Sequence, residues 1–177
     1  GLVGPPANAA EFISHAQKLT RTDPDGRTQV WGTRIWPWWF HAASAIVQHG
    51  GSLFTEDGMR AAISSGVAAD ALQYLADLVF AHEVSPRPDQ PVPDFIAGTL
   101  ALSIDGVWML PAFKRHRQQD PLFEFGVASA DNLYGNEDRA VWGNGHSLVM
   151  LSGVEEARRE AVITVMDYLS RESARWI

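Results

Sequence analysis

Residues 94–108 read D-F-I-A-G-T-L-A-L-S-I-D-G-V-W, and this stretch decides how the rest of the chain is interpreted. A short amphipathic piece ends at Gly98, and the apolar run Leu100–Ile104 that follows predicts a buried strand. Asp105–Gly106 then predicts a turn, and the ring of Trp108 comes two residues later. A strand that ends in a Gly turn before a helix delivers its turn residues to the carboxyl edge of a sheet, where open α/β sheets bind ligands. We therefore expect a ligand site at this turn.

Length, charge and cysteine content exclude several classes of protein. The chain has 177 residues, which is enough to bury a core without metals or disulfides. A net charge of −7 with scattered basic residues argues against nucleic acid as a partner. The chain has no cysteine, which excludes disulfides, thiolate metal sites and Cys nucleophiles. No apolar run approaches the ~18 residues of a membrane span, and residues 1–6 do not have the pattern of a signal peptide.

Hydrophobic spacing predicts alternating helices and strands. Helices are expected at residues 8–20, 36–49, 59–64, 67–82 and 108–117. A last helix, with Val162, Val165, Met166 and Leu169 on its buried face, is expected after a capping box of Ser152 and Glu155. Strands are expected at residues 29–33, 100–104, 123–128 and 147–151. Turns or loops are expected at residues 23–26, 85–88 and 131–139, and the whole is interpreted as one α/β domain, residues 1–177.

The tryptophans are the unusual feature of the composition. There are seven, at positions 31, 36, 38, 39, 108, 142 and 176. A single Trp most often fills the core or a surface crack. Four of these, however, stand beside Gly or Pro turns, where rings tend to be only partly buried. This placement favours a surface on which a flat ligand stacks.

Motifs of the common catalytic and cofactor sites are absent. The sequence has no G-x-G-x-x-G, P-loop, H-E-x-x-H or G-x-S-x-G. The fragment Gly143–Gly145 is too short to cradle a phosphate, and the dispersed histidines form no metal pattern. Only His146 is expected near a site, and an ordinary surface or core histidine explains it equally well. Asp105 has no second carboxylate at the separation that glycosidases use. We therefore expect no catalytic residue, metal or cofactor.

What remains is a set of aromatic rings beside small residues and polar turn groups. Indole faces pack on the apolar C–H patches of sugars, while Asp, Asn and backbone N–H groups bond the hydroxyls. A peptide or an aromatic ligand would use similar surfaces, so both stay open at this point.

Several segments also follow a known order. Residues 8–20 are similar to P-x-T-W-D-E-F…A-K-K-L-T, with Ala9 where Trp is usual, and residues 50–54 to N-G-G-x-L. Residues 72–86 are similar to A-L-x-x-L-x-D-L-V…P. The stretch 94–108 is similar to F-x-x-G-x-x-A-M-x-x-x-G-x-W, with Leu102 where Met is common. In this order and spacing the segments resemble the ABC-transporter extracellular solute-binding proteins of family 1, which include maltose-binding and other sugar-binding proteins.

The resemblance implies a type II periplasmic-binding-protein-like fold, of which this chain supplies mainly the helix-rich second lobe with a small mixed sheet. The first lobe and the closing helices would be largely absent. The implied protein is a monomer outside the cytoplasm, periplasmic or held as a lipoprotein. It would bind a sugar or oligosaccharide between its lobes and dock on an ABC permease without catalysis.

By resemblance and by turn chemistry together, the expected ligand-binding residues are Trp36, Trp38, Trp39, Asp105, Gly106, Trp108, Trp142, Gly143, Asn144, Gly145 and His146. The alternative is a fragment of a carbohydrate-active enzyme that uses Asp105 as an acid/base with an acid from the 131–138 loop. A third interpretation, a purely structural or interaction domain, predicts no response to small ligands.

Overall fold

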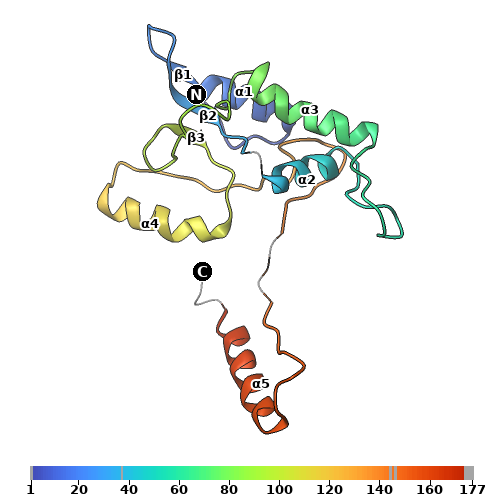
Figure 1. The fold of residues 1–177 in the computed structure, drawn as a ribbon. Coiled ribbons are helices and arrows are strands. Elements are labelled where there is room, and N and C mark those ends of the chain that lie inside the picture. The colour runs from blue at the N-terminus through green and yellow to red at the C-terminus, as the bar shows by residue number, and fades with distance from the viewer. Residues whose placement is uncertain (1, 37, 144, 146, 174–177) are drawn as a thin grey trace.

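The computed structural model describes residues 2–36, 38–143, 145 and 147–173. Figure 1 shows a small sheet with helices around it, and a last helix that stands apart. The helices are α1 (Ala9–Leu19), α2 (Trp39–Gln48), α3 (Gly66–Phe80), the 3₁₀ turn η1 (Val107–Met109), α4 (Leu110–Gln119) and α5 (Glu156–Arg171). The strands are β1 (Arg21–Thr22), β2 (Thr28–Thr33) and β3 (Leu100–Leu102).

The sheet is mixed, as expected, with the order β1-β2-β3. Strand β2 runs antiparallel to β1 and parallel to β3, and its residue Thr33 pairs with Leu102. Parallel pairing means that β2 and β3 end at the same edge of the sheet. The segments that follow these two strands therefore leave the sheet side by side.

Helix α1 begins and packs as its sequence predicts. The side chain of Asn8 accepts a hydrogen bond from the Glu11 amide at 2.9 Å, and the Glu11 carboxylate accepts one from the Ala7 amide at 3.0 Å. These bonds satisfy amides that the first turn leaves without partners. At the other end, Thr20 Oγ1 donates to the carbonyl of Ala16 and accepts from the amide of Gly32, at 2.8 and 3.0 Å. This hydroxyl fastens the helix to β2.

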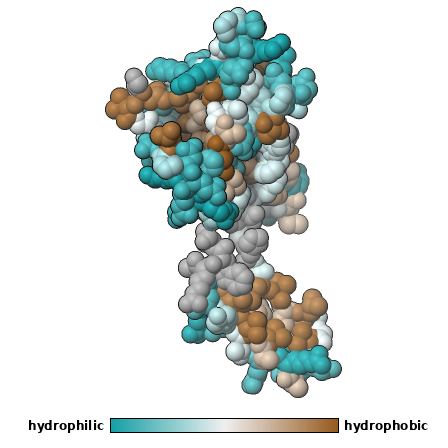
Figure 2. All heavy atoms as spheres, turned by 90° about the vertical axis from the view of Figure 1, so that its left-hand side faces the viewer, coloured by the Kyte–Doolittle hydropathy of each residue, from teal (hydrophilic) through white to brown (hydrophobic). Residues whose placement is uncertain are grey.

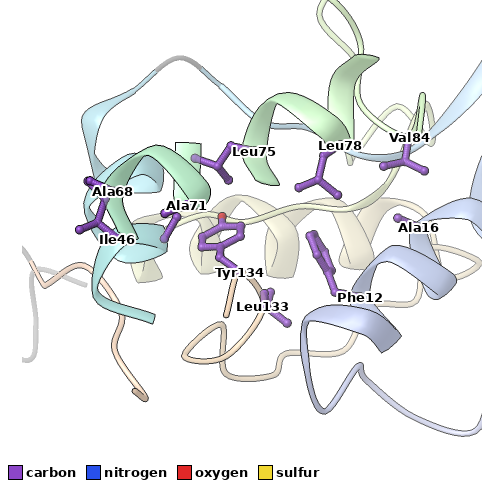
Figure 3. Packing of buried hydrophobic residues seen from close by; sticks show 11 residues of the cluster. Phe12, Ala16, Ile46, Ala68, Ala71, Leu75, Leu78, Val84, Leu133 and Tyr134 are labelled. Atoms are coloured by element: carbon purple, nitrogen blue, oxygen red, sulfur yellow. The ribbon is translucent and has the colours of Figure 1, made fainter. Parts of the chain in front are cut away.

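The core lies where α1, α2 and α3 meet the loop before residue 135. Phe12 from α1, Leu75 and Leu78 from α3, and Tyr134 from the loop point toward one another (Figure 3). The Phe12 and Tyr134 rings meet edge to face, with their centroids 6.3 Å apart. Apolar residues at helical spacing on α1 and α3 therefore form this core, although Leu72 of α3 is exposed.

One predicted helix and two predicted strands do not form. Residues 59–64 are a turn instead of a helix, because the Asp57 carboxylate accepts from Thr55 Oγ1 and from the Met59 amide. Phe54 and Ala61 then form an isolated antiparallel bridge across that turn. Residues 123–128 and the residues 147–151 have no strand structure, since neither segment pairs with a strand among the described residues.

The last helix also differs from expectation. No side chain caps it, so the capping box of Ser152 and Glu155 is wrong, and none of its residues is buried. Val165 is exposed, while Val162, Met166 and Leu169 are half-buried, because no other described element packs closely on them. Apolar side chains accordingly gather on the surface of the part that carries α5 (Figure 2). No helix among the described residues combines the length and the apolar character that crossing a membrane requires.

Candidate ligand-binding site

The predicted site segments leave the same edge of the sheet. Arg34, Ile35 and Trp36 follow β2 directly, and the Asp105–Gly106 turn comes three residues after the end of β3. Because β2 and β3 are parallel neighbours, both segments start from the carboxyl edge. This is the edge at which the sequence predicted a ligand site.

The first group of predicted residues lines a hollow of about 480 Å³. Its walls are the segment after β2, the start of α2, one side of α3 and the connector after α3. We call it the aromatic hollow; its lining includes Trp36, Trp38, Trp39, Phe80 and the aliphatic residues Leu72, Leu75 and Val79. Trp38 is 54% exposed and Trp39 60% exposed. Rings that are half open to solvent are free to receive a ligand on one face.

The aromatic residues hold one another at defined angles. The rings of Trp36 and Trp38 meet edge to face at 6.0 Å, and Trp38 meets Phe40 in the same way at 5.4 Å. Edge-to-face contacts of this kind stabilise a pair by about 0.5–1.5 kcal/mol beyond the buried area. The ring of Trp38 is therefore kept in place although more than half of it is exposed.

Trp142 joins this group from a distant part of the chain. Its ring meets that of Trp39 at 3.8 Å and an interplanar angle of 72°. Its amide donates to the Ser44 hydroxyl of α2 at 3.1 Å. The structure thus brings together four of the predicted tryptophans, Trp36, Trp38, Trp39 and Trp142.

Gln48 holds the loop that carries Trp142, and the sequence reasoning missed it. Its fully buried amide donates to the carbonyls of Ala130 and Ala140, at 3.0 and 2.6 Å. Its side-chain oxygen accepts from the amides of Tyr134 and Gly135, at 2.8 and 3.3 Å. One side chain therefore binds both ends of the loop and its middle to α2. The available signal was a Gln in a mostly apolar helix, three residues after Ala45 on the buried face.

The second group of predicted residues lies at another hollow, of about 510 Å³, between β3, α4 and residues 124–130. Asp105 and Gly106 line it together with Phe95, Phe113 and Phe125. The Asp105 carboxylate accepts a hydrogen bond from the Ser103 hydroxyl. The structure therefore separates this turn from the three tryptophans of the aromatic hollow.

Trp108 covers the turn. A side-chain carbon added to Gly106 would come within 2.1 Å of the indole ring, so the ring lies directly on this glycine. Trp108 itself is 63% exposed. Of the remaining predicted residues, Gly143 and Gly145 are exposed, and Asn144 and His146 lie outside the described residues. Ligand binding by any of these residues stays a prediction.

The polar groups of the aromatic hollow carry positive or no charge. Arg34 lies over the Trp36 ring, 5.2 Å from its centroid, and Arg87 lies over Phe80 at 5.8 Å. His41 is buried and its Nδ1 is 2.6 Å from the hydroxyl of Tyr134. Burial, and secondarily the charge of Arg34, lower the pKa of His41 to about 4, so its ring is neutral at pH 7. No group of three His, Asp or Glu side chains in the described ranges is placed to hold a metal ion.

The family profile of bacterial extracellular solute-binding proteins matches residues 1–175. The chain belongs to this family of solute-binding proteins. The match spans nearly every residue, so it covers both groups of predicted site residues and confirms the resemblance found in the sequence motifs. A comparison of this chain with curated proteins found no match.

Solved structures similar to this family member were determined with sugars. One is a maltose/maltodextrin-binding domain from Bdellovibrio bacteriovorus bound to maltotriose, with 21% identity and a TM-score of 0.69 over 95% of this chain. Another is an ABC substrate-binding protein from Listeria monocytogenes in complex with cycloalternan, with 26% identity and a TM-score of 0.62 over 78%. A third is an ABC transporter solute-binding protein from Thermotoga lettingae bound with alpha-D-tagatose, with 23% identity and a TM-score of 0.60 over 76%.

These similarities confirm the α/β fold of periplasmic binding proteins. The matched regions make up 44%, 34% and 35% of those three chains. The chain therefore spans less than half the length of the structures it resembles.

Proposed function

We propose that this chain is part of the solute-binding component of an ABC importer and captures a carbohydrate without chemical conversion. The observation that carries the proposal is the aromatic hollow, in which the half-exposed rings of Trp38 and Trp39 are held by neighbouring rings. Such rings match the apolar C–H faces of sugars, and polar neighbours bond the hydroxyl groups. The sugars bound by the similar structures support the same ligand class.

We further propose that the chain supplies mainly the second lobe of a two-lobed protein, with part of the ligand cleft formed by another lobe. In this arrangement the Asp105–Trp108 turn contributes a wall of the cleft that is separate from the aromatic hollow. Hinge closure on the sugar would then create the form that docks on the permease outside the cytoplasm. The extracellular character of the family supports this location, and a lipid anchor or a periplasmic location belongs to the same proposal.

The enzymatic alternative requires an acid from the 131–138 loop to work with Asp105. Asp131, the first candidate, is bound by the Arg139 guanidinium through two hydrogen bonds of 3.1 and 3.2 Å. The Arg139 hydrogen bond is the main cause that lowers the pKa of Asp131, which favours its ionised form, and Asp131 is not part of the lining of the hollow that contains Asp105. Ligand capture is therefore the better-supported function.

Replacing Trp39 with Ala tests the proposal. We expect saccharide affinity, measured by calorimetry and by quenching of tryptophan fluorescence, to fall roughly tenfold, since a lost aromatic stack costs about 1.5 kcal/mol. Phe54→Ala is the matched control, because Phe54 is equally exposed but lies at the start of the 54–61 turn and not in the lining of the aromatic hollow. Equal affinities for both variants would contradict stacking in the aromatic hollow. Glycoside turnover that Asp105→Asn abolishes would instead establish the enzyme.

A further inference from the structure

Two arginines give the aromatic hollow a charge that a neutral sugar does not need. Arg34 and Arg87 both line it, and none of the described residues in its lining is an Asp or Glu. Asp89 lies in the same connector as Arg87 but is exposed and is not part of the lining. The chain carries a net charge of −7, so a positive hollow is a local feature and not the general character of the surface.

Both guanidinium groups are positioned by aromatic rings, and their charges remain uncompensated. Arg34 lies over Trp36 and donates from Nη1 to the carbonyl of Pro93 at 3.1 Å. Arg87 lies over Phe80, which is also part of the lining. Neither arginine forms an ion pair within the part of the chain that the structure describes. A guanidinium that stacks on a ring keeps its N–H edge free, and this edge fits a carboxylate.

The two arginines and the aromatic rings together favour ligands of a particular charge. A cationic solute would gain from the ring faces, as quaternary ammonium ions do in aromatic cages, but two guanidinium charges would repel it. A neutral sugar would use the rings and leave both charges without a partner. A solute with a flat apolar face and a carboxylate would use both.

We propose that the aromatic hollow binds an acidic saccharide, with a uronate carboxylate held by Arg34 and Arg87 and the sugar ring stacked on Trp38 or Trp39. This inference rests on the proposed function, since it names the class of sugar that the same site takes. A carboxylate could also arrive on a non-sugar aromatic acid, and the test separates the two sources.

The test is calorimetric titration of the full chain with trigalacturonate and with neutral galactotriose at low salt. We expect trigalacturonate to bind on the order of tenfold more tightly, with an advantage that falls as salt is added. Arg34→Gln and Arg87→Gln should each remove most of this preference, and Arg34→Lys, which keeps the charge, should retain part of it. Arg27→Gln, an equal charge change in the exposed turn before β2, should leave the preference unchanged.

Three results would overturn the inference, and they differ in what they say of the proposed function. Equal affinity for the two trisaccharides would refute the acidic ligand and leave sugar capture standing. A preference that survives both Gln variants would place the anion elsewhere. Binding of benzoate with no binding of either trisaccharide would refute the sugar and the proposed function together.

Discussion

Replacing Gln48 with Met should destabilise the fold by about 3 kcal/mol. The side-chain oxygen of Gln48 accepts hydrogen bonds from the amides of Tyr134 and Gly135. Both residues are buried, so water cannot replace this oxygen as the acceptor. Each buried amide left without a partner costs about 1.5 kcal/mol. The carbonyls of Ala130 and Ala140 belong to half-buried residues, so water can hydrate them when the Gln48 amide is lost. Met also preserves the volume of Gln, so neither the lost carbonyl bonds nor a cavity adds much to the destabilisation.

Urea unfolding followed by circular dichroism measures this loss directly. Gln73→Met is the matched control, because Gln73 makes one exposed hydrogen bond to Asp77 on α3 and its loss should change stability by less than about 0.5 kcal/mol. The same Gln48 variant should loosen the contact between Trp142 and Trp39, which shifts the tryptophan emission. A Gln48→Met protein as stable as Gln73→Met would refute the idea that this amide holds the loop.

Two further changes test the packing and the buried histidine. Gly32→Ala should lower the free energy of unfolding by about 3 kcal/mol, because the added carbon would lie 2.0 Å from the Ala16 carbonyl oxygen. Gly126→Ala is the control and should be nearly neutral, because the space around Gly126 is open. Equal unfolding midpoints for the two variants would contradict this packing. His41 has a pKa of about 4 in the fold and 6.5 when unfolded, so the unfolded chain binds more protons between these values and stability should rise by about 3 kcal/mol from pH 4 to 6.5. His41→Gln should lose this share of the slope in unfolding curves across that range, and an unchanged slope would show that His41 does not titrate in this way.

Local sequence signals predicted the elements whose interactions are local. Helix α1 formed as expected because Asn8 and Glu11 cap it within one turn, and α3 because its apolar residues repeat at helical spacing. Residues 123–128 and the residues 147–151 carry strand-like patterns, but a strand also requires a partner, which a single segment cannot specify.

In the site, too, the sequence predicted the features that depend on neighbouring residues and not those that depend on distant ones. The Asp105–Trp108 turn was predicted because a strand end and a glycine mark it, and Trp36, Trp38 and Trp39 because they stand beside a proline at a predicted helix start. These residues lie in two separate hollows because of the way α2 and α3 pack. The spacing of residues along the sequence does not predict that packing. Gln48 was missed for a related reason, since its hydrogen-bond partners are distant in the chain.

The central claim is that a saccharide binds on the rings of the aromatic hollow. Nuclear magnetic resonance of the indole N–H groups tests it most directly, because each tryptophan contributes a separate signal. During titration with an oligosaccharide, we expect the signals of Trp38 and Trp39 to shift and saturate together, while Trp31, on β2, stays in place. Shifts at Trp31 alone, or at no tryptophan while calorimetry shows binding, would contradict the claim.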